Sequence, residues 1–119
     1  IYHTNVLMAI ATEYALVCLA AISDDARRAE VAERLADSGR TVLDLDFGQV
    51  GDFAGNAIEL TGRDGRVLAL SARAAAALTP EQRAVIEASA QLLPLSIPTI
   101  ELAGGSVRCM LAGVHLTPR

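Results

Sequence analysis

The chain has 119 residues and a formal net charge of −4, and 52% of its residues are hydrophobic. This length corresponds to at most one ordinary domain, and the apolar content excludes a disordered chain. No cluster of basic side chains forms a stripe for nucleic acid, and no apolar run approaches the roughly 20 residues of a bilayer span. We therefore expect neither nucleic acid nor a membrane as a partner.

Two cysteines in a chain of this size do not make a disulfide framework. No charged segment followed by an apolar run indicates a secretory signal, so a reducing cytoplasm is the expected location. The sequence starts at Ile1 directly in a predicted strand, without an initiator methionine. This start suggests a fragment or a processed product of a longer protein.

Residues 1–50 are predicted to form one strand–strand–helix–strand unit. Short apolar runs rich in Val, Ile, Leu and Tyr predict strands, and alternation of apolar and polar residues predicts the last one. An N-cap with acidic residues in the first turn starts the helix, and a Ser-Gly pair stops it. In chain order, the expected elements are strands at 5–10 and 14–22, a helix from Ser23-Asp24-Asp25 to Ser38-Gly39, and a strand at 41–46.

Residues 51–102 repeat this order. The turn Arg63-Asp64-Gly65 predicts a hairpin between strands at 56–60 and 66–70. A helix is expected to start at Thr79-Pro80-Glu81-Gln82, which supplies an N-cap, a proline at the first helical position and a glutamine at the third. That helix should run to about Ala90, and an extended segment is expected at 92–101.

The two units are related by an offset of 51 residues, which joins Asn5 to Asn56 and the strand at 15–19 to that at 66–70. A coincidental pair of α/β units is the alternative interpretation of this pattern. A last strand, Val107 to Leu116, is expected outside the second unit. It is typical of the closing strand of a circular repeat fold.

Cys109 is the first candidate for chemistry. It follows Gly104-Gly105, which permit close backbone approach, and it adjoins the cationic Arg108, which favours a reactive thiolate. A buried structural cysteine is the alternative, and Cys18, within a plain apolar strand, is interpreted in that way.

His3 is the second candidate, because a cysteine–histidine pair needs convergence in space and not proximity in sequence. A surface or capping histidine is the alternative. His115 is interpreted as structural. The histidines and cysteines show no metal-ligand spacing, so no metal site is expected.

At these residues the chain resembles the arginine deiminase-related, citrulline-utilisation hydrolase branch of the amidinotransferase superfamily, whose members modify guanidino groups. The resemblance covers essentially the whole chain, and its most specific segment places the cysteine directly after a glycine-rich turn. The segments that carry it are His3-Thr4-Asn5-Val6-Leu7-Met8, Asp52-Phe53-Ala54-Gly55-Asn56, Leu78-Thr79-Pro80-Glu81-Gln82 and Ile100-Glu101-Leu102-Ala103-Gly104-Gly105-Ser106-Val107-Arg108-Cys109-Met110.

The resemblance implies a five-bladed α/β propeller, the pentein fold, built from ββαβ repeats. The chain would be a partial pentein domain of two repeats, followed in residues 103–119 by the nucleophile turn and the closing strand. The other blades, and the acidic residues that orient the histidine and hold the guanidinium in the family, would lie upstream of Ile1. The first and last strands would then be open edges through which the chain could self-associate.

The resemblance also implies roles for individual residues. Cys109 matches the nucleophile and His3 the catalytic histidine, while Asn5, Asn56 and Arg108 are candidates for substrate binding. Many relatives have aspartate at the position of Asn5, and a neutral amide there favours a ureido group, such as that of citrulline, over a cationic guanidine.

The implied reaction is hydrolysis of a C–N bond in a ureido or guanidino amino acid through a covalent cysteine intermediate, without a cofactor. An amidinotransferase is one alternative, because an acceptor amine could replace water. A non-catalytic fragment or binding module, lacking the upstream acidic residues, is the other. We expect the 119-residue chain by itself to be inactive.

Overall fold

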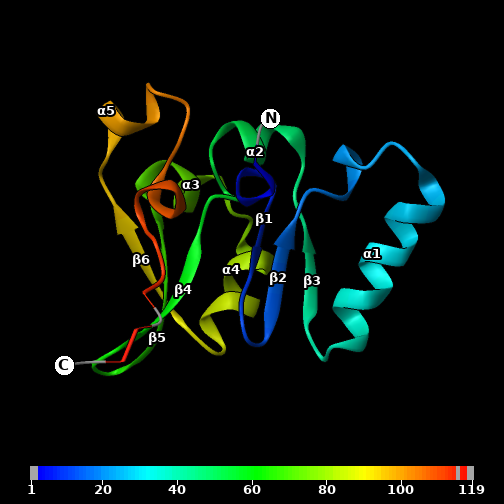
Figure 1. Cartoon of the computed structure of the whole chain (residues 1–119), viewed down its shortest axis with the longest axis horizontal. Helices are drawn as coiled ribbons and strands as arrows, with labels where there is room; N and C mark the ends of the chain where they lie inside the picture. Colours follow the sequence, from blue (N-terminus) through cyan, green and yellow to red (C-terminus); the bar gives the residue numbers. More distant parts are fainter. Residues whose placement is uncertain (1–2, 115, 118–119) are drawn as a thin grey trace.

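The computed structural model describes residues 3–114 and 116–117, and these form two three-stranded sheets. Figure 1 shows the sheets next to each other, with β1 (Met8–Ile10) and β4 (Ile58–Gly62) adjacent in the middle of the molecule. The chain is therefore α/β, as the sequence predicts.

The first sheet has the strand order β1-β2-β3, with β2 at Tyr14–Val17 and β3 at Thr41–Asp44. β1 and β2 are antiparallel, whereas β2 and β3 are parallel and joined by helix α1 (Asp25–Asp37). The Asp24 carboxylate caps α1 by accepting a hydrogen bond from the backbone N–H of Arg27 at 3.0 Å. Gly39 follows the helix at φ +85°, a conformation that glycine adopts without strain.

The second sheet repeats this topology in the order β4-β5-β6, with β5 at Gly65–Ser71 and β6 at Gln91–Leu95. Its parallel crossover holds two helices, α3 (Ala72–Ala77) and α4 (Pro80–Glu87). α4 begins with the predicted capping box, in which Thr79 and Gln82 bond to each other's backbone N–H groups.

The hairpins of the two units have the same register. Ala9 pairs with Leu16 in the first, and a shift of 51 residues leads to the observed pair of Leu60 with Val67 in the second. In the parallel pairs, Tyr14 lies opposite Thr41 and Val67 lies opposite Gln91. The chain that connects the two paired strands is therefore three residues shorter in the second unit than in the first. The two predicted ββαβ units are thus confirmed.

The units share one hydrophobic core. Leu16 and Leu43 of the first sheet and Leu68, Leu70 and Ile86 of the second unit belong to a single cluster of buried side chains. Because side chains alternate across a strand, Ala15 and Val17 point to the other face of β2 and pack under α1. The first sheet is therefore covered on both faces, by α1 and by the second unit.

Polar contacts also join the units. The side chains of Gln49 and Gln82 hydrogen-bond to each other at 2.7 Å in a buried position, and Glu59 accepts a hydrogen bond from the hydroxyl of Thr12 at 2.5 Å. Near this junction the phenol of Tyr14 is buried, and its pKa is raised above the ordinary value. Burial is the main cause, and the negative charge of Glu59 adds to it.

Four sequence-based expectations are wrong in detail. The predicted strand 5–10 begins with a 3₁₀ turn, η1 (Thr4–Val6), and the predicted strand 14–22 ends in another, η2 (Leu19–Ala21). The extended segment 92–101 turns into a short helix, α5 (Pro98–Glu101), because the ring of Pro98 fixes a helical φ at its first position. The expected closing strand Val107–Leu116 is absent from the described residues. A 3₁₀ turn, η3 (Val107–Met110), stands at its start.

Two further helices, α2 (Phe47–Gly51) and α3, were not predicted. Within the described part of the chain, no helix has the length and apolar character to cross a bilayer. β1, β3, β4 and β6 each pair on one side among the described residues. Self-association through such edges stays a prediction, with Leu93 of β6 as an exposed apolar side chain on one of them.

Candidate active site

Cys109 lies on η3 and is exposed, whereas Cys18 is buried at the end of β2. The turn before it depends on Gly104, whose φ of +88° disfavours any residue with a side chain. The hydroxyl of Ser106, which is fully buried, donates to the Glu101 carboxylate at 3.2 Å, and the Ser106 carbonyl accepts from the backbone N–H of Cys109 at 3.1 Å. These contacts hold the thiol on a tight turn and not on the expected strand.

Asn56 faces this thiol from the loop between α2 and β4. Its side chain is fully buried, and its Nδ2 lies 3.1 Å from the Sγ of Cys109, to which it donates. The side-chain Oδ1 of Asn56 accepts a hydrogen bond from the backbone N–H of Cys109 at 3.4 Å. The backbone carbonyl of Asn56 accepts one from the backbone N–H of Arg108 at 3.3 Å. Three contacts therefore attach η3 to this single residue.

The same amide also reaches the start of the chain. The Nδ2 of Asn56 donates to the backbone carbonyl of Asn5, on η1, at 2.8 Å. His3 is the residue before η1 and is exposed, and its backbone carbonyl accepts from Val6 at 3.2 Å. Asn56 thus brings the turn that carries His3 and the turn that carries Cys109 onto one side chain. Among the described residues, no hydrogen bond joins the imidazole to the sulfur.

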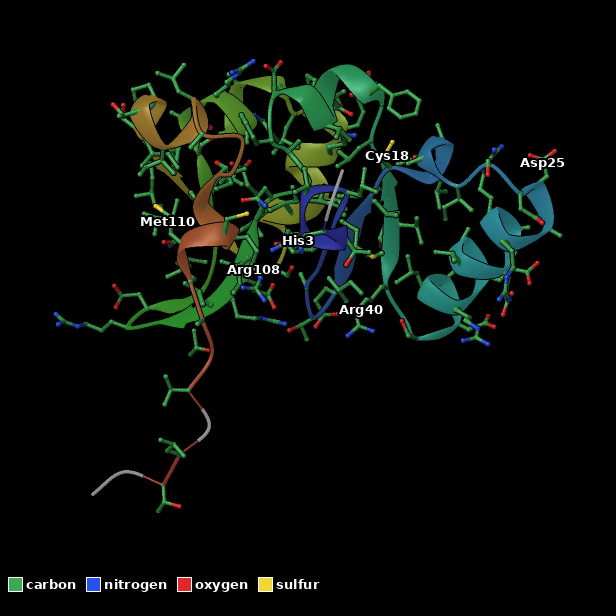
Figure 2. The ribbon with its side chains drawn as sticks, turned by 45° about the horizontal axis from the view of Figure 1, so that its top comes forward. His3, Cys18, Asp25, Arg40, Arg108 and Met110 are labelled. Carbon is green, nitrogen blue, oxygen red and sulfur yellow. The ribbon has the colours of Figure 1, made fainter. Side chains whose placement is uncertain are left out.

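Figure 2 shows His3 and Arg108 on the same side of the molecule, with Cys18 away from both. A groove of about 470 Å³ lies beside Arg108, and its polar lining comes from Thr4, Asn5 and Arg108. The rest of its wall is formed by side chains of β1, Ala57 and Ile58. Neither Cys109 nor His3 is among the residues that line this groove.

Two candidate binding residues can be described within the groove. The Oδ1 of Asn5 is buried and accepts no hydrogen bond from the described residues. Arg108 is half-buried as a residue, and its guanidinium donates to the carbonyl of Leu111, directly after η3, at 3.0 Å. The groove therefore combines a neutral amide and a cation with apolar side chains.

The other candidates do not extend the site. His115 lies outside the described residues, so its interpretation as structural is untested. Among the residues that the structure describes, no three His, Cys, Asp or Glu side chains are grouped as metal ligands would be.

The loop that presents Asn56 is held in an unusual conformation. Phe53 has a φ of +64°, which non-glycine residues rarely adopt, and its ring is covered by the guanidinium of Arg73 at 5.6 Å. Arg73 also pairs with Asp52 at 2.6 Å. Gly55 then passes so close to η1 that an added Cβ would lie 2.5 Å from the carbonyl oxygen of Val6. Sequence patterns indicate none of these contacts, because they join segments 20 or more residues apart.

We expect Gly55→Ala to push the Asn56 loop away from η1, because the obstacle is rigid backbone. Overpacking of this kind costs about 1–3 kcal/mol of unfolding free energy. Chemical denaturation should measure the loss, and alkylation of Cys109 should slow at the same time. Gly51→Ala is the control, since nothing lies within 4 Å of an added Cβ there. Equal effects of both substitutions would contradict the proposed role of close approach.

Comparison with known proteins gives one family and one fold. A family model described as "DDAH_eukar: N,N dimethylarginine dimethylhydrolase, eukaryotic" matches residues 1–116. No sequence among the curated proteins matches the chain at a significant level.

Among solved structures, apo ArgZ, an arginine dihydrolase from the ornithine-ammonia cycle in cyanobacteria, matches with a TM-score of 0.67 and 16% identity, over 92% of this chain and 15% of that one. AgrE in a ternary complex with ornithine and NAD⁺ matches with a TM-score of 0.68 and 17% identity, over 92% of this chain and 14% of that one. The N-terminal domain of ArgZ bound to product matches with a TM-score of 0.64 and 18% identity, over 92% of this chain and 36% of that one.

The chain therefore spans a small part of each of these proteins, and at such identities the matches establish the fold alone. They are pentein-fold proteins, so the two ββαβ units form part of a pentein domain. The family model covers nearly the whole chain. The chain belongs to the family described as N,N dimethylarginine dimethylhydrolase, eukaryotic, among the guanidino-group-modifying penteins.

Proposed function

We propose that the full-length parent of this chain is a cysteine-dependent hydrolase that cleaves a C–N bond of a guanidino or ureido amino acid. The observation that carries the proposal is the convergence on Asn56: the exposed thiol of Cys109 and the turn of His3 are held by one buried amide. A shared anchor for turns from opposite ends of the chain supports a common site for a nucleophile and an acid–base group.

In the proposed reaction, the Cys109 thiolate attacks the central carbon of the substrate, so a C–S bond forms. The C–N bond then breaks, and protonated His3 gives its proton to the departing amine. Water next attacks the S-linked carbon while His3 accepts one of its protons. A C–O bond forms, the C–S bond breaks, and the thiolate returns.

Solved relatives support this chemistry. One ArgZ N-terminal domain with a cysteine replaced by serine is bound to substrate, and an asparagine-to-serine variant of the same domain is covalently bonded to a reaction intermediate. A cysteine nucleophile in this chain would act in the same way. The acidic groups that complete the site are proposed to come from another part of the parent protein, and we expect the 119-residue chain alone to be inactive.

A neutral ureido substrate such as citrulline is favoured by Asn5. Asn5 gives the groove a neutral amide, which lacks the negative charge that would hold a guanidinium. Arg108, in the same groove, offers a cation for the substrate carboxylate. Both cysteines are free thiols, which agrees with the proposed reducing, cytoplasmic setting.

Alkylation by a haloacetamidine tests the thiol. The reagent mimics an amidine, so we expect it to label Cys109 at least about 100-fold faster than buried Cys18, because burial excludes the reagent. Peptide mass mapping of the full-length parent measures both rates. Preincubation with citrulline should protect Cys109. Equal labelling of the two cysteines, or slower labelling of Cys109, would remove the thiol from the mechanism.

The same parent protein should then be offered citrulline, arginine and dimethylarginine, with release of ammonia or dimethylamine as the readout. Turnover in water alone supports the hydrolase. Turnover only after addition of an acceptor amine would identify an amidinotransferase. No turnover with any of them, together with tight ligand binding, would identify a binding module.

A further inference from the structure

The nitrogen and the oxygen of the Asn56 carboxamide both form hydrogen bonds within the protein. Nδ2 donates to the carbonyl of Asn5 and to the Sγ of Cys109, and Oδ1 accepts from the backbone N–H of Cys109. The side chain is fully buried and does not line the groove. An amide in this state has no N–H left for a substrate, which argues against the substrate-binding role expected from the sequence.

The chemistry of its neighbours fixes how this amide is oriented. The Asn5 carbonyl can only accept a hydrogen bond, so the nitrogen of Asn56 must face it. The backbone N–H of Cys109 can only donate, so the oxygen must face that side. With both ends determined, the second N–H of the nitrogen is the one directed at the sulfur, 3.1 Å away.

We propose that Asn56 is a positioning residue that holds the Cys109 thiolate in place and fixes its distance from the His3 turn. The inference rests on the proposed function and refines it. An N–H directed at the sulfur stabilises the anion that must attack, because hydrogen bonds to charged acceptors are stronger than those to neutral ones. The second N–H, to Asn5, ties the turn that follows His3 to the same amide.

Gln82 provides a matched control. It is also a buried amide whose nitrogen and oxygen are both bonded, to the Asp44 carbonyl at 3.0 Å and to the Gln49 amide nitrogen at 2.7 Å. It also joins the two units, but it has no contact with Cys109. Replacing either amide by its carboxylate isostere removes buried donors, and only one of the two replacements removes a donor to the sulfur.

The test compares Asn56→Asp, Asn56→Leu and Gln82→Glu in the full-length parent. We expect both Asn56 variants to lower kcat and the rate of Cys109 alkylation by neutral iodoacetamide about 10-fold to 100-fold, as loss of a preorganised donor does. KM should change less than about threefold, since the side chain of Asn56 does not line the groove. Gln82→Glu should lower the melting temperature while the alkylation rate stays within about twofold of wild type.

Using two replacements separates donor loss from charge, because Leu adds no charge. A normal alkylation rate in Asn56→Leu, with a slow one only in Asn56→Asp, would overturn the proposal. So would a rate loss in Gln82→Glu as large as in the Asn56 variants.

A measurement on folded protein guards against variants that fail to fold. In Cys109→Ser, we expect one side-chain N–H proton resonance of Asn56 to shift and the proton bonded to Asn5 to stay in place. Two unmoved resonances would overturn the contact. Full turnover in Cys109→Ser would defeat the proposed function itself, whereas an inactive Cys109→Ser beside a fully active Asn56→Leu would defeat this inference alone.

Discussion

Replacement of Cys109 by serine is expected to lower kcat/KM of the full-length parent by about 10⁴-fold or more, since the covalent step is lost. A hydroxyl is a far weaker nucleophile than a thiolate. Steady-state release of ammonia or amine measures the loss.

Folding should hardly change in Cys109→Ser. The residue is exposed, and a serine hydroxyl can still accept the N–H of Asn56, so the unfolding free energy should stay within about 0.5 kcal/mol. Cys18→Ala is the control: it should lower stability, because Cys18 is buried in the core, and keep turnover. Activity in Cys109→Ser close to that of wild type would contradict the covalent mechanism.

Replacement of His3 by alanine is the second large effect, with an expected loss of about 10²–10⁴-fold in kcat, the usual contribution of general acid–base catalysis. His3 is exposed and its side chain makes no capping hydrogen bond, so the fold should tolerate the change. Rates at several substrate concentrations separate kcat from KM.

Added imidazole offers a direct check on His3. If the lost group transfers protons, free imidazole should restore part of the rate in His3→Ala and none in Cys109→Ser. Alkylation of Cys109 should continue in His3→Ala. A variant with wild-type turnover would show that His3 is the surface histidine that its position before a turn also permits.

The elements that the sequence predicts well are those set by local chemistry. The turn at Arg63-Asp64-Gly65 joins β4 and β5, and Thr79 with Gln82 caps α4, because each signal acts within a few residues. The 51-residue repeat is also visible in sequence, and the hairpin registers follow it.

The elements that the sequence predicts poorly are set by contacts between distant segments. Val107–Met110 has strand-like composition, but Ser106 and Asn56 hold it as a turn, and Asn56 is more than 50 residues away. α3 was missed because an alanine run directly follows a strand, where only the cap of Ser71 marks the change. In both cases tertiary or capping interactions override the intrinsic preference of the residues.

The candidate site divides in the same way. Cys109 and His3 can be selected from residue type and resemblance, since both carry chemistry that few other residues can supply. The structure adds that their turns share Asn56, a residue whose sequence context implied substrate binding. A hydrogen bond between residues 56 and 109 leaves no pattern in a single sequence, so its geometry could not be anticipated.

Gly55 and Asn56 lie where the first unit, the second unit and the C-terminal turn all touch. Hydrogen bonds lose their strength over a fraction of an ångström, far less than the movement needed to unravel a helix or a sheet. In the proposed enzyme, catalytic competence is thus tied to how the units are docked and not to how much regular structure they contain. We expect a slight shear between the sheets to abolish the proposed reaction while each unit keeps its shape.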